Sequence, residues 1–112
     1  MDMMKFKRFD VCLVNLDPTI GSEIKKTRPV IIVSPDSMNQ SRLNTVIVAP
    51  MTSTIRDNFP TRINLSFKDK KGQIALDQIR VIDRSRIIKI LGSINDSVQN
   101  NILHTLAIMF SK

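Results

Sequence analysis

A series of short apolar segments separated by turn residues restricts this chain to a small, β-rich fold. The segments 11–16, 30–33, 45–49, 61–67 and 73–79 are rich in aliphatic and β-branched residues, and each is shorter than a typical helix. A chain of 112 residues can bury one hydrophobic core but not two. We therefore expect a single domain, residues 1–112, built from roughly five to seven short strands.

Turn residues indicate how these segments are joined. Ser34 is a typical N-cap residue followed by proline, which predicts a short helical turn through Asn39. Pro50 has no backbone N–H, so it should end the pairing of its strand or confine that strand to a sheet edge. Residues 69–72 are typical of a hairpin turn, and residues 81–91 are compatible with either a strand or a short helix.

Apolar residues at helical spacing predict an amphipathic helix at the C-terminal end of the chain, after capping residues near position 95. The predicted apolar stripe consists of Val98, Ile102, Leu106 and Met109, widened by Leu103 and Phe110. Such a helix would pack on the sheet. The expected fold class is therefore mostly β with α additions, a strongly curved barrel or sandwich-like sheet.

The charge of the chain indicates an anionic partner. Lys and Arg number 17 against 10 acidic residues, and the resulting net charge of +7 is spread along the sequence. The same charge could also serve solubility alone. A single cysteine, Cys12, cannot form an internal disulfide, and no apolar stretch is long enough to span a bilayer, so we expect a cytoplasmic protein without a membrane segment.

Several chemistries lack the residues they need. Three glycines offer no glycine-rich phosphate loop, and one histidine, one cysteine and scattered acids offer no metal cluster. We expect neither a cofactor nor a metal. His104 is interpreted as a structural or surface residue and Cys12 as a small buried hydrophobe. The absence of Trp and Tyr leaves five Phe and the Arg side chains to contact bases in any complex with RNA.

Three stretches carry a resemblance to a known family. The first comprises Leu16-Asp17-Pro18-Thr19, Gly21-Ser22-Glu23 and Thr27-Arg28-Pro29-Val30, followed by Ile31-Ile32-Val33-Ser34. The second is Asn44-Thr45-Val46-Ile47-Val48-Ala49-Pro50-Met51-Thr52-Ser53, and the third is Ala75-Leu76-Asp77-Gln78-Ile79-Arg80 with Ile82-Asp83 and Ser85-Arg86. In this order they cover most of residues 9–92, and the chain closely resembles the MazF/PemK/Kid family of toxin endoribonucleases.

The resemblance implies a fold, an activity and partners. Members of this family are homodimers with a small curved SH3-like or CcdB-like β-barrel and a C-terminal helix. They cleave single-stranded RNA at short sequence motifs without a metal ion. A labile cognate antitoxin neutralises them by covering the RNA-binding groove with an acidic C-terminal segment.

The matched motifs also suggest catalytic residues. Arg28 matches the catalytic arginine of the family, and Thr52 matches a threonine whose hydroxyl can hydrogen-bond the phosphate. The planar guanidinium could hold two phosphate oxygens or present a proton to the leaving 5′-oxygen. A carboxylate is the natural general base, and both Glu23 and Asp77 fall in matched motifs. Alternatively, Asp77 braces Arg28 or Arg80 in an ion pair, and Glu23 is a solvated loop charge.

Five further polar residues are candidates for RNA binding, namely Lys25, Lys26, Ser53, Arg56 and Gln78. The loop 53–60 is the expected selector of RNA sequence, although the basic residues could simply be solvated charge. The chain departs from the family pattern at two positions. Ala75 stands where some relatives have a catalytic arginine, so the acid role falls to Arg28. Phe9 stands where the family usually has Gly, which should change how the first strand begins and could shift a groove wall.

Two alternative functions remain open. Relatives of this architecture include toxins that poison DNA gyrase by protein contact rather than by cutting RNA. The chain could also be a plain nucleic-acid-binding module driven by its positive charge. Arg28 and Thr52, both in the nuclease motifs, favour the endoribonuclease.

Overall fold

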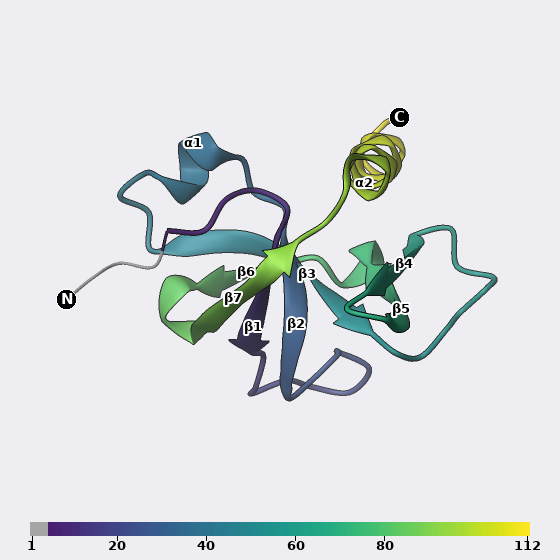
Figure 1. The fold of residues 1–112 in the computed structure, drawn as a ribbon, viewed down its shortest axis with the longest axis horizontal. Helices are drawn as coiled ribbons and strands as arrows, with labels where there is room; N and C mark the ends of the chain where they lie inside the picture. Colours follow the sequence, from purple (N-terminus) through teal and green to yellow (C-terminus); the bar gives the residue numbers. More distant parts are fainter. Residues whose placement is uncertain (1–4) are drawn as a thin grey trace.

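The computed structural model describes residues 5–112, which form a curved sheet with a long C-terminal helix (Figure 1). The strands are β1 (Asp10–Asn15), β2 (Thr27–Ile32), β3 (Thr45–Thr52), β4 (Arg62–Phe67), β5 (Lys70–Ala75), β6 (Arg80–Asp83) and β7 (Ile87–Ser93). The helices are α1 (Asp36–Asn39) and α2 (Asp96–Met109), and two 3₁₀ turns are η1 (Leu76–Gln78) and η2 (Arg84–Arg86). The predicted fold class, a small curved β-barrel with a C-terminal helix, is confirmed.

The sheet is antiparallel, and β3 is its central strand. The strand order is β4-β5-β3-β2-β1-β7, and β6 pairs separately with β3. β3 pairs with β6 through Thr45–Val48 and with β5 through Met51–Thr52, while Val48–Pro50 pair with β2. Pro50 therefore lies where β3 exchanges β6 for β5. The expectation that Pro50 ends the strand or confines it to an edge is wrong, because the pairing changes partner at this residue and continues beyond it.

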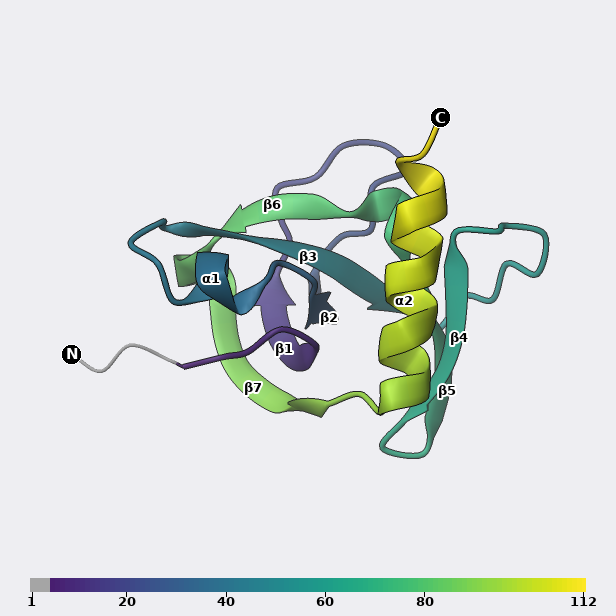
Figure 2. The same cartoon turned by 90° about the horizontal axis from the view of Figure 1, so that it is seen from above.

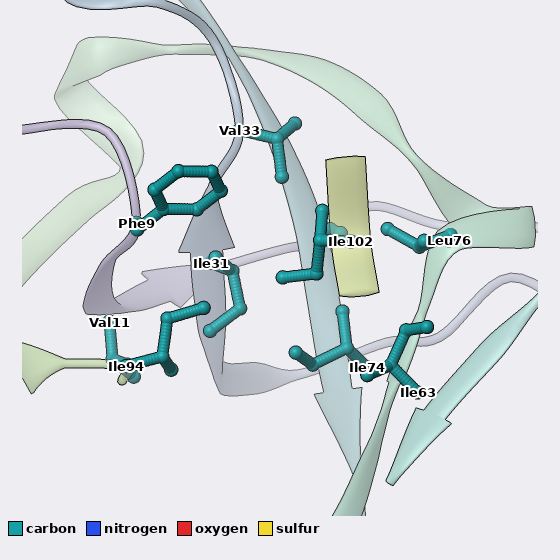
Figure 3. Close-up of a cluster of buried hydrophobic side chains, with 10 residues drawn as sticks. Phe9, Val11, Ile31, Val33, Ile63, Ile74, Leu76, Ile94 and Ile102 are labelled. Atoms are coloured by element: carbon teal, nitrogen blue, oxygen red, sulfur yellow. The ribbon is translucent and has the colours of Figure 1, made fainter. Parts of the chain in front are cut away.

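Side chains on the two faces of the sheet form two hydrophobic clusters. The cluster beneath α2 (Figure 3) contains Phe9, Val11, Ile31, Val33, Ala49, Ile63, Ile74, Leu76, Ile94 and Ile102. The cluster on the other face contains Phe6, Cys12, Val14, Leu16, Val30, Ile32, Val46, Val48 and Ile82. Cys12 is buried as expected, and desolvation, reinforced by the charge of Asp10, raises the pKa of its thiol to about 12.

α2 lies along β4, as Figure 2 shows, and begins with a side-chain cap. The Asn95 Oδ1 accepts a hydrogen bond from the Val98 backbone N–H at 2.9 Å. The predicted stripe is confirmed at its centre, because Ile102 is fully buried. The predicted widening is wrong, because Leu103 and Phe110 both remain exposed. No helix within residues 5–112 has the length and apolar character needed to cross a membrane.

Several predicted turns are shifted. The β4–β5 hairpin turns at Lys68 and Asp69, whose φ angles are 49° and 65°, rather than at residues 69–72. Gly72 belongs to β5, where a Cβ atom would lie only 2.7 Å from the Thr52 carbonyl oxygen. Ser34 does not cap α1, because Pro35 occupies the N-cap position. The Ser34 hydroxyl donates instead to the Asn39 side chain at 2.6 Å. The ambiguous region 81–91 is divided between β6, η2 and β7.

Phe9 has a backbone conformation that normally favours glycine. Its φ of 71° lies in the left-handed region, which is unfavourable for residues with a Cβ atom. The Phe9 ring is buried beneath α2, and the Arg8 guanidinium lies 5.2 Å from its centroid. Burial of the ring offsets the backbone strain. Phe9 therefore contributes to the core beneath α2, and its predicted effects on the start of the first strand and on a groove wall stay predictions.

Candidate functional site

The polar start of β2 and the polar end of β3 lie next to the hydrophobic cluster on the sheet face opposite α2, which we call the inner cluster. Alternation along β3 places Thr52 on the same face as the buried Val46 and Val48, and alternation along β2 places Arg28 on the same face as Val30. Val30 pairs with Pro50, and continuing this antiparallel register by two residues brings Arg28 opposite Thr52. The same pleat that buries the core therefore brings these two side chains together.

Arg28 and Thr52 line a groove of about 510 Å³ between the β1–β2 loop and the β3–β4 loop. Figure 1 shows the β1–β2 loop on the side of the sheet opposite α2 and the β3–β4 loop beside β4 and β5. The Arg28 Nε donates to the Lys25 carbonyl at 2.7 Å, which orients the guanidinium and leaves its terminal nitrogens available for a ligand. The Thr52 Oγ1 accepts from the Thr54 backbone N–H at 3.1 Å, and its hydroxyl proton remains available to donate.

The β1–β2 loop is fixed to the rest of the fold by side chains from the third matched stretch. The Gln78 Oε1 accepts from the Ile24 N–H at 2.5 Å, and its Nε2 donates to the Ser22 carbonyl at 3.1 Å. Arg80 and Arg86 donate to backbone carbonyls at the start of the loop. Gln78, predicted as an RNA-binding residue, therefore also positions the loop.

The two candidate carboxylates have different surroundings. Glu23 is exposed and lines the groove, and its Oε1 accepts from the Ile20 N–H at 2.6 Å. Asp77 lies in η1, where Arg62 donates to both carboxylate oxygens, Nε to Oδ1 at 2.8 Å and Nη2 to Oδ2 at 3.1 Å. The Thr61 hydroxyl donates to the same Oδ1 at 3.0 Å. The prediction that Asp77 braces Arg28 or Arg80 is wrong, because its partner is Arg62.

These contacts change the acidity of Asp77. Partial burial by itself would raise the pKa of this carboxyl, because the charged form loses hydration. The hydrogen bonds from Arg62 and Thr61 outweigh that effect and hold the pKa of Asp77 below its ordinary value. A carboxylate that already receives three side-chain hydrogen bonds is a weak proton acceptor, so this arrangement favours a positioning role.

The predicted RNA-binding residues divide between two adjoining hollows. Lys25, Arg56 and Gln78 line the groove with Arg28 and Thr52. Lys26 and Ser53 line a second hollow of about 400 Å³, to which Arg28 and Thr52 also belong. Its other basic residues are Lys70 and Lys71. Arg28 and Thr52 therefore lie where two cationic hollows meet.

The sequence interpretation missed three residues around the groove. Arg62 and Phe59 both line it, and the Arg62 Cζ lies 5.3 Å from the centroid of the Phe59 ring. Gln73 is buried opposite Thr52, where its Oε1 accepts from the Arg56 N–H at 3.0 Å and its Nε2 donates to Asn64 at 2.8 Å. Gln73 could have been noticed in the sequence, because it is a glutamine within an apolar strand. No feature of the sequence indicated the contact between Phe59 and Arg62.

Two other positions considered in the sequence analysis, His104 and Ala75, do not line the groove. His104 is exposed on α2, in agreement with its interpretation as a surface residue. Ala75 is fully buried at the end of β5, so its position supplies no charge to the site. Within residues 5–112, no three His, Cys, Asp or Glu side chains are arranged to hold a metal ion.

Comparisons with known proteins agree on one family. The family described as PemK-like, MazF-like toxin of type II toxin-antitoxin system matches residues 7–110. The crystal structure of MazF (Form-I) from Deinococcus radiodurans is similar with a TM-score of 0.78 and 23% identity, over 92% of this chain and 94% of that one. The Mycobacterium tuberculosis toxin MazF-mt6 gives a TM-score of 0.74 at 20% identity, over 90% and 95% of the two chains.

A third similar structure contains a partner. It is an endoribonuclease in complex with its cognate antitoxin from Mycobacterial species. This endoribonuclease matches with a TM-score of 0.74 and 21% identity, over 95% of this chain and 93% of that chain. At these identities the three structures establish the shared fold.

The Asp77–Arg62 pair should stabilise the protein in a pH-dependent way. Because the pKa of Asp77 is lowered in the folded state, its contribution is full above the ordinary carboxyl pKa, about 3.9, and is lost as the pH falls through the lowered value. Asp77→Asn should therefore reduce the free energy of unfolding by about 1–2 kcal/mol at pH 7, allowing for partial exposure. Urea denaturation from pH 7 to pH 3 measures the effect.

The matched control is Asp69→Asn, which removes the same charge from the exposed turn of the β4–β5 hairpin. This variant should unfold like the wild type throughout. The deficit of Asp77→Asn should shrink below about pH 4, because the carboxyl of the unfolded wild-type chain then takes up its proton while the folded carboxyl, with its lowered pKa, stays charged to lower pH. A deficit that is unchanged at pH 3 would contradict the assigned ion pair.

Proposed function

Because this chain belongs to the family of PemK-like, MazF-like toxins of type II toxin–antitoxin systems, we propose that it is an endoribonuclease that cuts single-stranded RNA at short motifs without a metal ion. The observation that carries the proposal is that Arg28 and Thr52 line one cationic groove. Residues 1–112 would act as one toxin domain in the cytoplasm. The RNA itself would supply the nucleophile, through the ribose 2′-hydroxyl.

The proposed reaction is a transesterification at phosphorus. The 2′-oxygen attacks the adjacent phosphate and the bond to the 5′-oxygen breaks, which leaves a 2′,3′-cyclic phosphate and a 5′-hydroxyl. The terminal nitrogens of Arg28 would hold the non-bridging oxygens as negative charge develops, and the Thr52 hydroxyl would donate to one of them. Because position 75 is a buried alanine, Arg28 would also supply the proton to the leaving 5′-oxygen.

Glu23 fits the role of general base better than Asp77. The Glu23 side chain lies in the groove with one hydrogen bond, from the Ile20 N–H, whereas Asp77 receives three side-chain hydrogen bonds. A base must present a free oxygen toward the 2′-hydroxyl, within hydrogen-bond reach. We therefore assign proton removal to Glu23, and assign to Asp77 the placement of Arg62.

The partners follow from the family and the charge of the groove. A similar endoribonuclease in complex with its cognate antitoxin supports an antitoxin partner. We propose that this antitoxin inserts an acidic segment beside Arg28, Lys25 and Arg56, because these three side chains make the groove cationic. We also propose a homodimer. Ile88 and Ile90, exposed on β7 at the end of the sheet order, offer apolar surface for a second copy of the chain.

Arg28→Ala should lower the rate of RNA cleavage by at least about 100-fold, because removing a preorganised donor to a developing oxyanion costs this much in other enzymes. Arg28→Lys should remain strongly impaired, because a single ammonium cannot reproduce the guanidinium fork. The assay follows cleavage of a long single-stranded RNA in excess EDTA, and sequencing of the 5′ ends identifies the motif.

The matched control is Arg42→Ala, which removes the same charge from an exposed loop position outside both hollows. Its cleavage rate should equal that of the wild type. Full cleavage activity of Arg28→Ala would contradict the proposed mechanism. Intact RNA after long incubation with the wild type, together with inhibition of gyrase supercoiling or salt-sensitive RNA binding alone, would instead favour one of the two alternative functions.

Glu23→Gln separates the two candidate bases. If Glu23 removes the proton, Glu23→Gln should lose most of the cleavage activity, because an amide cannot accept the proton of the 2′-hydroxyl. Asp77→Asn should lower the rate less, because Asp77 acts through the placement of Arg62. The measurement is the cleavage rate of both variants under single-turnover conditions. A Glu23→Gln variant that cuts RNA at the wild-type rate would reassign the base.

A competition experiment tests the partners. A fluorescent RNA oligonucleotide with a 2′-deoxy sugar at the cleaved position should bind without being cut, and the antitoxin should displace it. Antitoxin binding that leaves this RNA in place would locate the antitoxin elsewhere. Light scattering on the free protein should give about twice the chain mass of 12.7 kDa, and a monomeric mass would exclude the dimer.

A further inference from the structure

The aromatic residues of this chain are few and unevenly placed. The sequence contains no Trp or Tyr and five Phe, of which Phe6 and Phe9 are buried in the two cores. Phe67 packs against the core beneath α2, and Phe110 follows the end of that helix. Phe59 lines the groove that contains Arg28 and Thr52, whereas Phe67 lines the adjoining second hollow.

One face of the Phe59 ring is covered by the side chain of Arg62. The Arg62 guanidinium lies over the ring, with its Cζ 5.3 Å from the centroid, which is within cation–π range. The local backbone is a turn, in which the Phe59 N–H donates to the Arg56 carbonyl at 3.4 Å and the Arg62 N–H donates to the Phe59 carbonyl at 3.1 Å. Although one side is covered, 47% of Phe59 remains exposed to solvent.

Arg62 is not itself available as a phosphate ligand. Its side chain is only 7% exposed, and its charge is compensated by the two hydrogen bonds to Asp77. Asp77 contacts Arg62, and Arg62 contacts the Phe59 ring, so an ion pair supports an aromatic side chain that lines a cationic groove.

We propose that Phe59 is an RNA-binding residue on which one unpaired RNA base stacks, next to the phosphate held by Arg28 and Thr52. This inference rests on the proposed endoribonuclease function and deepens it. An aromatic face attracts a base of any identity, and a groove with Arg28, Lys25 and Arg56 holds the phosphates on either side of that base. Arg62 and Asp77 are then positioning residues for the ring.

The experiment compares binding of the uncleavable, 2′-deoxy-substituted RNA to matched variants. Phe59→Leu keeps an apolar side chain but removes the aromatic face, and it should weaken RNA binding by about 5- to 100-fold, the range for loss of one stacked base. Phe59→Tyr keeps the ring and should bind within about 2-fold of the wild type. Phe110→Leu makes the same exchange at a residue that is 76% exposed beyond α2, and it should leave binding unchanged.

A scan with abasic nucleotides identifies the stacked base. Removing one particular base from the RNA should weaken wild-type binding as much as Phe59→Leu does, and it should have no further effect in Phe59→Leu, because both changes remove the same contact. Equal wild-type and Phe59→Leu affinities would overturn the inference. Penalties that multiply at every abasic position would overturn it as well.

A tryptophan reporter gives a second readout. Because the natural sequence has no Trp, the fluorescence of Phe59→Trp comes from this position alone, and stacking should quench it on RNA binding but not with the abasic oligonucleotide. Wild-type cleavage with no quenching and no Phe59→Leu effect would overturn the stacking inference and leave the endoribonuclease intact. Absence of RNA cleavage by the wild type would overturn both.

Discussion

The two-residue alternation of β3 is the constraint on which both the core and the site depend. Val46 and Val48 point into the inner cluster, and the same parity carries Pro50 and Thr52 along that face toward the groove. Strand pairing is kept through Pro50 because β3 pairs with β6 before this residue and with β5 after it. A one-residue slip would turn Thr52 away from Arg28 and move the valines out of their cluster to the face beneath α2, so the packing of the core enforces the geometry of the site.

The loops around the groove are held by polar side chains that bond to backbone atoms. Gln78 bonds to both Ile24 and Ser22, and Gln73 receives the Arg56 N–H from the β3–β4 loop. Each of these glutamines comes from or follows β5, so one element ties down both loops. Such bonds hold the loops around Arg28 and Thr52 in place without a ligand, which would remove part of the ordering cost from the proposed RNA-binding step.

The sequence was sufficient where the information is local. Strands followed from apolar segments and the centre of the α2 stripe followed from helical spacing, whereas the roles that the motifs assign to Arg28 and Thr52 stay predictions. It was insufficient where geometry depends on distant residues. The hairpin turn lies earlier than predicted, because Lys68 and Asp69 adopt positive φ angles that could not be predicted from the sequence pattern. The partner of Asp77 is Arg62 because β4 pairs with β5 in one particular register, and this long-range pairing has no sequence signature.

The net charge of +7 overstates the charge that this fold can offer to RNA. Arg84 donates to the carbonyls of Leu43 and Asn39, and Arg80 and Arg86 donate to carbonyls at the start of the β1–β2 loop, so these arginines serve the backbone. The charge of Arg62 is compensated by that of Asp77. The salt dependence of RNA binding should therefore reflect the groove cations rather than the whole-chain charge, because only cations that contact phosphate release counterions. The positions of the groove cations, rather than the net charge of the chain, then define the proposed RNA-binding surface.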